Sequence, residues 1–226
     1  EGMNRRVLLV DDEIEVLKGI ERNLFDKFEV VTAIGGDAAL KRLSESEPFA
    51  VVVSDMRMPE MDGSEILSQV RRRFPDATRM LLTGHSDIDA TVQAVNQGNI
   101  YRFLVKPCPD EELERALEDG ITQHSLVVAE RELLQRTLMS AVSAIAEVLS
   151  LVDPALFSRA SRLEQLLKPA LDNFKYEPRW AVEMAAKLSQ LGCVAVPRPI
   201  VQRVNQGIAN NERERAIFEG RSEEHT

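Results

Sequence analysis

Residues 51–63, VVVSDMRMPEMDG, constrain the fold more than any other stretch of the chain. Three consecutive valines without polar alternation predict a strand buried on both faces, which is typical of the centre of a parallel sheet. Asp55 ends this run, and Pro59 and Gly63 then turn the chain into a helical pattern. The Asp55 carboxylate is expected at the carboxyl edge of the sheet, where open α/β sheets place their reactive groups. Asp55 is therefore the first candidate for chemistry.

Strand and helix patterns alternate along residues 3–122, which we interpret as one domain. Short apolar runs predict strands over 5–10, 28–33, 51–55, 80–83 and 100–105, with helical spacing between them. Asp87 is a suitable N-cap for the fourth helix, over 88–97, and the acidic residues 110–112 open the fifth helix. Five strands and five helices in this order predict a doubly wound, flavodoxin-like α/β domain with a five-stranded parallel sheet.

Polar residues follow four of the predicted strands, at points that a parallel sheet brings to one edge. Asp11 and Asp12 follow the first strand, Asp55 the third and Lys106 the fifth, while Thr83 closes the fourth. Neighbouring carboxylates repel one another unless a cation joins them, and oxygen ligands with room for water suit Mg²⁺. A lysine and a hydroxyl beside them can hold the oxygens of a phosphoryl group. The residues therefore predict a metal-assisted phosphoryl site with an aspartate nucleophile.

The segments VLLVDDE, VVVSDMRMPEMDG, MLLTG and YRFLVKP, in this order, resemble the receiver domain of two-component response regulators over about residues 3–122. The resemblance implies that Asp55 accepts a phosphoryl group from a phosphohistidine of a sensor histidine kinase. It also implies that Asp12, with Asp11 assisting, holds Mg²⁺ together with Asp55 and the backbone carbonyl of Arg57.

The same resemblance assigns roles to residues on the last two strands. Lys106 pairs with the phosphoryl charge, and Thr83 swings to form a hydrogen bond with it. Phe103 stands at the place of the family's switch aromatic, which rotates inward when Thr83 moves. The Lys106–Pro107 bond is expected to be cis, a geometry tolerated only before proline.

The residues by themselves leave some of these roles open. A lone aspartate after a strand is usually a turn residue or a helix cap. The assignment of Asp55 therefore depends on polar residues occurring together at the ends of four strands. Phe103 is also compatible with a plain core position. Arg57 and His85 flank the site, and either tune the lifetime of the acyl phosphate or lie on a solvated surface.

A long apolar stripe follows the receiver-like part, and we interpret residues 123–139 as a connecting helix, with a break near Gly120 left open. The members of the stripe repeat in steps of three and four: Leu134, Leu138, Ala141, Ile145, Val148 and Val152. Such a stripe either pairs with a second copy as a coiled coil, which would give a homodimer, or packs on its own second domain. The sequence does not decide between these two arrangements.

Residues 140–226 follow a helical pattern, which predicts an all-α output domain without an evident site of its own. Two stretches, 153–162 and 185–197, resemble the HD-GYP family, whose members commonly follow a receiver and hydrolyse cyclic di-GMP. The second stretch, AAKLSQLGCVAVP, follows the family pattern AALLHDIGKIGIP almost throughout. A helical output domain of another type, such as an HDOD-like module, is the alternative.

The departures from the HD-GYP pattern fall on the metal ligands. Arg159 stands where the family has a histidine, and Ser189 and Gln190 replace its His-Asp pair. Cys193 replaces the lysine after glycine, and Arg221 lies near the position of another ligand histidine. A diesterase site needs bound metal to activate water, and metal needs imidazole or carboxylate ligands. We therefore predict a degenerate, truncated domain with no metal and no hydrolysis.

Charge and composition restrict the partners. The net charge of −9 lies wholly in residues 1–122, since residues 123–226 contain 13 Lys and Arg and 13 Asp and Glu. A DNA-reading domain normally has a basic face, so a nucleic-acid partner is not expected. No apolar run reaches the roughly 20 residues that span a bilayer. Cys108 and Cys193 lie too far apart in sequence to suggest a pair. These features predict a cytoplasmic protein with reduced thiols and no membrane partner.

We therefore predict a response regulator in which phosphorylation of Asp55 controls a noncatalytic helical domain through protein–protein interaction or dimerisation. The expected partners are a sensor histidine kinase and an output protein that the sequence does not identify. No enzymatic activity is expected beyond phosphorylation and dephosphorylation of the receiver itself. Two alternatives come from other classes: a receiver-coupled cyclic di-GMP phosphodiesterase and a DNA-binding regulator.

Overall fold

The computed structural model describes residues 3–45, 47–84, 100–152, 154–174, 179–189, 196, 198–206 and 211–212. The chain divides into two compact units, Glu1–Arg131 and Glu132–Thr226. Within the described residues, no helix combines the length and the apolar content that crossing a membrane requires.

The first unit is built on a five-stranded parallel sheet with the strand order β2-β1-β3-β4-β5. Its strands are β1 (Arg6–Asp11), β2 (Glu29–Ile34), β3 (Val51–Asp55), β4 (Thr78–Thr83) and β5 (Arg102–Val105). Its helices are α1 (Ile14–Leu24), α2 (Gly35–Glu45), α3 (Gly63–Arg73) and the first part of α5 (Asp110–Val152). The predicted doubly wound parallel fold is confirmed, while the helix expected over 88–97 lies outside the described residues.

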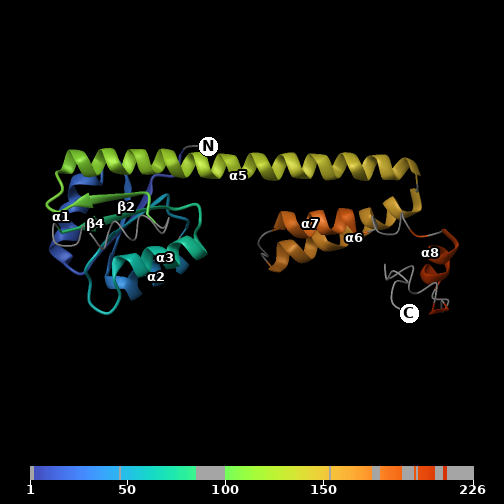
Figure 1. Ribbon diagram of the computed structural model, residues 1–226, viewed down its shortest axis with the longest axis horizontal. Helices are drawn as coiled ribbons and strands as arrows, with labels where there is room; N and C mark the ends of the chain where they lie inside the picture. The colour runs from blue at the N-terminus through green and yellow to red at the C-terminus, as the bar shows by residue number, and fades with distance from the viewer. Residues whose placement is uncertain are drawn as a thin grey trace, which may run out of the picture. The chain divides into compact units, whose positions relative to one another are not determined.

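Helices cover both faces of the sheet, as Figure 1 shows. Val51 and Val53 of β3 face α1 and α5, whereas Val52 faces α2 and α3, and all three valines are fully buried. Alternate residues of a strand point to opposite faces, so a strand covered on both sides needs an unbroken apolar run. This is why the valine run of β3 occupies the centre of the sheet.

Helix α5 passes through Gly120 without a break, so the alternative of a break at this residue was wrong. A Cβ atom built on Gly120 would lie 2.4 Å from Met80 Cε and 3.1 Å from Val51 Cγ2. The hydroxyl of Thr78 donates a hydrogen bond to the Gly120 carbonyl oxygen at 2.8 Å. Gly120 thus allows the helix to approach the sheet closely, and burial there offsets its low helix propensity.

Further along α5, two side chains hold the loop between α3 and β4. The Nδ1 atom of the buried His124 lies 2.8 Å from the carbonyl oxygen of Asp76. Arg131 forms an ion pair with the Asp76 carboxylate. These contacts attach α5 to the first unit as far as Arg131, the last residue of that unit.

The described part of the second unit is helical, as predicted. It contains α5 from Glu132 onward, α6 (Pro154–Phe174), α7 (Arg179–Leu188) and α8 (Arg198–Asn205). Arg179 at the start of α7 forms ion pairs with Asp172 of α6 and with Glu183. The Nζ atom of Lys187 in α7 donates a hydrogen bond to Ser143 Oγ of α5 at 3.1 Å.

Candidate functional site

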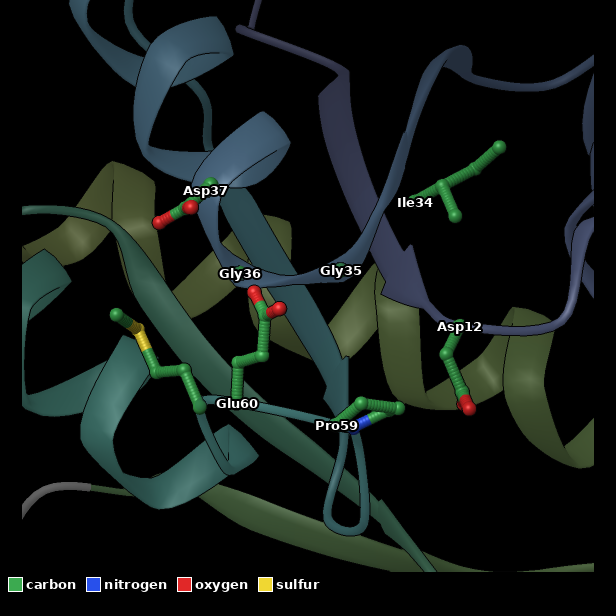
Figure 2. Close-up of a pocket in the computed structure, with 8 residues that line it drawn as sticks. Asp12, Ile34, Gly35, Gly36, Asp37, Pro59 and Glu60 are labelled. Atoms are coloured by element: carbon green, nitrogen blue, oxygen red, sulfur yellow. The ribbon is translucent and has the colours of Figure 1, made fainter.

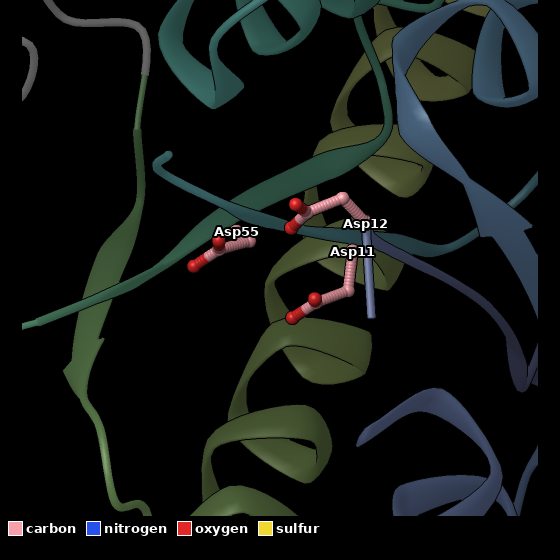
Figure 3. A group of neighbouring side chains, drawn as sticks. All are labelled: Asp11, Asp12 and Asp55. Atoms are coloured by element: carbon pink, nitrogen blue, oxygen red, sulfur yellow. The ribbon is translucent and has the colours of Figure 1, made fainter. Parts of the chain in front are cut away.

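Three carboxylates gather at the carboxyl edge of the sheet, where the adjacent strands β1 and β3 end (Figure 3). Asp11 is the last residue of β1, Asp12 follows it, and Asp55 is the last residue of β3. One carboxylate oxygen from each lies within 4.8 Å of the others. Asp11 and Asp55 are buried, whereas Asp12 is exposed. The cluster therefore has two inner carboxylates and one that faces solvent.

Lys106 joins the two buried carboxylates. Its Nζ atom lies 2.8 Å from an oxygen of Asp11 and 2.8 Å from an oxygen of Asp55. The backbone N–H of Lys106 donates a hydrogen bond to the carbonyl oxygen of Thr83 at 2.8 Å, which holds the end of β5 beside β4. The Lys106–Pro107 bond is cis, as predicted. A single ammonium group thus neutralises part of the charge that the aspartates concentrate here.

The electrostatics of Asp55 and Lys106 favour a further cation. Burial raises the pKa of Asp55, and the charge of Asp11 adds to this, while Lys106 only partly opposes the shift. Burial alone would lower the pKa of Lys106, but its hydrogen bonds to Asp11 and Asp55 outweigh burial and raise it. The Lys106 ammonium is therefore charged at neutral pH, and the Asp55 carboxylate still lacks full compensation.

Replacing Asp55 with asparagine is expected to raise the free energy of unfolding without added metal. A carboxyl group whose pKa is raised in the folded protein disfavours folding above that pKa, and a neutral amide of the same shape removes this penalty. The midpoint of thermal unfolding at pH 7 should therefore be higher for Asp55→Asn than for the unsubstituted chain. A lower midpoint would show that Lys106 compensates the carboxylate completely.

The loop after β3 is held close to the site. The N–H of Met56 donates a hydrogen bond to the Leu82 carbonyl at 2.8 Å, and the N–H of Gly63 donates to the Met56 carbonyl at 3.0 Å. Asp62 caps α3 by accepting a hydrogen bond from the backbone N–H of Glu65 at 2.9 Å. A Cβ atom on Gly63 would lie only 2.1 Å from the Asp55 carbonyl oxygen. The loop therefore requires glycine at this position.

The remaining residues that the sequence predicted for the site differ in their burial and in their place in the fold. Thr83 is fully buried at the end of β4, and its hydroxyl lies 3.2 Å from the Gly84 carbonyl oxygen. It stands one residue beyond Leu82, the partner of Asp55 in the β3–β4 register. Phe103 lies on β5 with 36% of its surface exposed. Arg57 is exposed on the loop after β3, and His85 lies outside the described residues.

A cavity of about 460 Å³ opens beside Asp12 (Figure 2). Its lining comes from the end of β2, the start of α2 and the loop after β3: Asp12, Ile34, Gly35, Gly36, Asp37, Pro59, Glu60 and Met61. Sequence reasoning did not identify this cavity. The Gly35-Gly36 pair after a strand was its only local signal, and Gly35 indeed has a positive φ of 76°.

Comparisons with known proteins match the first unit. A family model described as the response regulator receiver domain matches residues 7–118. The hydrogenase transcriptional regulatory protein HoxA of Cupriavidus necator is 32% identical over 53% of this chain and 25% of its own length. The transcriptional regulatory protein GlrR of Escherichia coli is 35% identical over 55% of this chain and 28% of its own length. The chain thus spans about a quarter of these curated relatives.

Two solved structures are also similar to the first unit. A structure titled adenylate cyclase from Rhodopirellula baltica has 42% identity and a TM-score of 0.57, over 58% of this chain and 97% of that one. The signal receiver domain of an HD domain-containing protein from Pseudomonas fluorescens Pf-5 has 35% identity and a TM-score of 0.51. That match covers 54% of this chain and 98% of the receiver domain.

Proposed function

Residues 7–118 belong to the response regulator receiver family, and from this premise we propose that Asp55 is the phosphoryl acceptor of the chain. The observation that carries the proposal is the position of Lys106 Nζ, 2.8 Å from oxygens of both Asp11 and Asp55. An ammonium held between an acceptor carboxylate and a metal-ligand carboxylate can contact the oxygens of an incoming phosphoryl group. The donor is the phosphohistidine of a sensor histidine kinase.

The donor set fits Mg²⁺. One carboxylate oxygen from each of Asp11, Asp12 and Asp55 lies within 4.8 Å of the others. Burial, with a smaller effect from the charge of Asp11, raises the pKa of Asp55, so a nearby cation would stabilise its carboxylate. These three side chains, with the backbone carbonyl of Arg57, would hold the ion. When bound, Mg²⁺ supplies positive charge that screens the phosphoryl oxygens from the carboxylates.

The residues of the chain then have distinct tasks in the transfer. An oxygen of Asp55 forms a bond to phosphorus while the bond from phosphorus to the histidine nitrogen breaks, and the electron pair stays on the imidazole. Lys106 contacts the phosphoryl oxygens as an ammonium, because its hydrogen bonds to Asp11 and Asp55 raise its pKa and keep it charged at neutral pH. Thr83 supplies a hydroxyl donor one residue past the strand partner of Asp55, and its movement would release space for Phe103 to turn inward.

Incubation with a small phosphodonor tests this proposal without the kinase. With Mg²⁺ the chain should gain one acid-labile phosphoryl group, detected by intact mass, and with excess chelator it should gain none. Uptake that is equal with and without Mg²⁺ would contradict the assigned metal site.

For the second unit we propose a degenerate, noncatalytic HD-type domain whose output is protein–protein interaction or dimerisation. The receiver of an HD domain-containing protein, 35% identical to the first unit, supports this type of partner domain. The Ser189 hydroxyl, where the family has a ligand histidine, donates to the Ala186 carbonyl at 2.7 Å. Gln190, Cys193 and Arg221 lie outside the described residues.

Two assays separate this proposal from its alternatives. Metal analysis together with cyclic di-GMP hydrolysis should show neither tightly bound transition metal nor turnover, and turnover would establish a diesterase. HoxA and GlrR are named as transcriptional regulators, but residues 123–226 carry no net charge. Salt-dependent binding to DNA would therefore contradict the interaction proposal.

A further inference from the structure

Met61, in the loop between β3 and α3, has a half-buried side chain. It packs on the apolar core between the sheet and the helices α2 and α3. It also lines the cavity of about 460 Å³ beside Asp12 (Figure 2). Met56 and Met58 in the same loop are half-buried too, but they are not part of this lining. The cavity therefore gives small solutes access to Met61.

Two neighbours enclose the Met61 side chain. A Cβ atom built on Gly36 would lie 3.0 Å from both Cβ and Sδ of Met61, so the absence of a side chain at residue 36 lets α2 pack this closely. From α3, Gln69 Nε2 donates a hydrogen bond to the Met61 sulfur at 3.6 Å, a weak bond because a thioether sulfur is a poor acceptor. The contact between α2 and the loop is therefore fitted to an unmodified thioether.

The backbone at Met61 closes a strained turn. Its N–H donates a hydrogen bond to the Pro59 carbonyl oxygen at 2.8 Å, and Glu60 between them has a φ of 70°. A hydrogen bond over two residues with a positive central φ is the rarer, strained form of the γ-turn. Such a backbone persists where the surrounding structure holds it in place. The packing of Met61 between Gly36 and Gln69 supplies that support at the end of the turn.

From these contacts we propose that Met61 is an oxidation site and that its oxidation by a peroxide slows phosphorylation of the receiver. The Met61 sulfur attacks one oxygen of hydrogen peroxide, the O–O bond breaks, and the proton of the transferred oxygen moves to the leaving hydroxide. The products are methionine sulfoxide and water, so the sulfur loses two electrons and the peroxide gains them. The sulfoxide is polar, and methionine sulfoxide reductases convert it back to the thioether.

The added oxygen changes the contact that holds the loop. It has no space on the side of Gly36, where even a Cβ atom would lie 3.0 Å from the sulfur. Gln69 donates more strongly to a polar sulfoxide oxygen than to a thioether sulfur, which favours a displaced Met61 side chain. The turn at Glu60 then loses its support, and the loop shifts together with the backbone carbonyl of Arg57, which the proposed function assigns to the metal.

Limited treatment of the full chain with hydrogen peroxide tests the site. Peptide mapping should show sulfoxide at Met61, while Met80, whose side chain is fully buried, stays unmodified. With a phosphodonor and Mg²⁺, the rate of phosphoryl uptake should then fall by about tenfold, since a misplacement of about 1 Å at a reacting site costs on the order of 100-fold. Treatment with methionine sulfoxide reductases should restore the rate.

Two leucine substitutions separate Met61 from the other methionines. Met61→Leu keeps an apolar side chain of similar volume and should retain its phosphorylation rate after peroxide treatment. Met3→Leu removes a methionine that is 59% exposed ahead of β1, and this variant should remain as sensitive as the unsubstituted chain. Equal sensitivity of Met61→Leu and the unsubstituted chain would overturn the proposal, and so would an unmodified Met61 under conditions that oxidise Met3.

A partly oxidised, unsubstituted chain gives the same answer without relying on the fold of a variant. Cleavage at lysine yields the peptide 42–106, which carries both Asp55 and Met61. In phosphorylated molecules this peptide should be depleted in Met61 sulfoxide, and equal sulfoxide content in phosphorylated and unphosphorylated molecules would contradict the inference. The effect on Asp55 rests on the proposed function, whereas the oxidation of Met61 is measured without a phosphodonor. A chain that takes up no phosphoryl group before oxidation would therefore contradict the proposed function, and the peptide map would still decide the oxidation site.

Discussion

The chain carrying Asp55→Ala is expected to take up no phosphoryl group under conditions in which the unsubstituted chain takes up one. Lys106 contacts one oxygen of Asp11 and one of Asp55, and alanine removes the Asp55 carboxylate, which is both the nucleophile and a metal ligand in this proposal. Asp11 and Asp12 are not expected to replace it, because Asp11 ends β1 and Asp12 follows directly, so both keep their own positions. Intact mass after incubation with a phosphodonor and Mg²⁺ measures the loss directly.

A matched control separates this effect from a general loss of acidic charge. Asp37 is exposed at the start of α2 and lines the neighbouring cavity, but it does not belong to the cluster of three carboxylates. Asp37→Asn should therefore be labelled to the same extent as the unsubstituted chain. Full labelling of Asp55→Ala would place the acceptor elsewhere and end the present assignment.

Gly63→Ala is expected to produce the largest loss of stability among single substitutions near the site, about 3 kcal/mol of unfolding free energy. The added Cβ would lie 2.1 Å from the carbonyl oxygen of Asp55, and backbone cannot swing away as a flexible side chain can. The loop must shift, which disturbs both the Gly63 to Met56 hydrogen bond and the position of Asp55. Urea unfolding should show a lower midpoint, and the phosphorylation rate should fall with it.

Gly19→Ala is expected to raise the free energy of unfolding, in contrast to Gly63→Ala. Gly19 lies inside α1, and a Cβ atom there would meet nothing within 4 Å. Since alanine stabilises a helix interior relative to glycine, this variant should gain roughly 0.5–1 kcal/mol. A Gly63→Ala protein as stable as Gly19→Ala would mean that the loop after β3 accommodates a side chain.

Local sequence patterns were sufficient for the strands and for the convergence of the carboxylates. The run at 51–53 predicted a strand buried on both faces because period-two alternation is absent, and β3 has that environment. Asp11 and Asp55 end the adjacent strands β1 and β3, and Lys106 follows β5 on the other side of β4, so the parallel topology brings all three residues to one edge of the sheet. The predicted ends of each strand agree with the ends in the structure to within two residues, because the apolar runs end where the strands do.

The features that sequence reasoning missed depend on contacts between distant segments. Gly120 has the propensity of a helix breaker, but the close fit against Met80 and the hydrogen bond from Thr78 keep α5 continuous. The first compact unit ends at Arg131, which pairs with Asp76, 55 residues away in the sequence. No periodicity in the helix itself reports such a pair.

The cavity beside Asp12 shows the same limit of local reasoning. Its walls come from three segments, and Glu60 reaches it through a backbone with a φ of 70°, an unusual value for a residue other than glycine. Sequence patterns reported the glycine pair at 35 and 36 as a turn, but not the volume that the turn encloses.

Peptide mapping of the phosphorylated, unsubstituted chain tests the central claim most directly. After incubation with a phosphodonor and Mg²⁺, digestion and tandem mass spectrometry should place the phosphoryl group on Asp55, and no phosphoryl group should be found after incubation with chelator. A phosphoryl group on Asp11, on Asp12 or on a residue of the second unit would contradict the account.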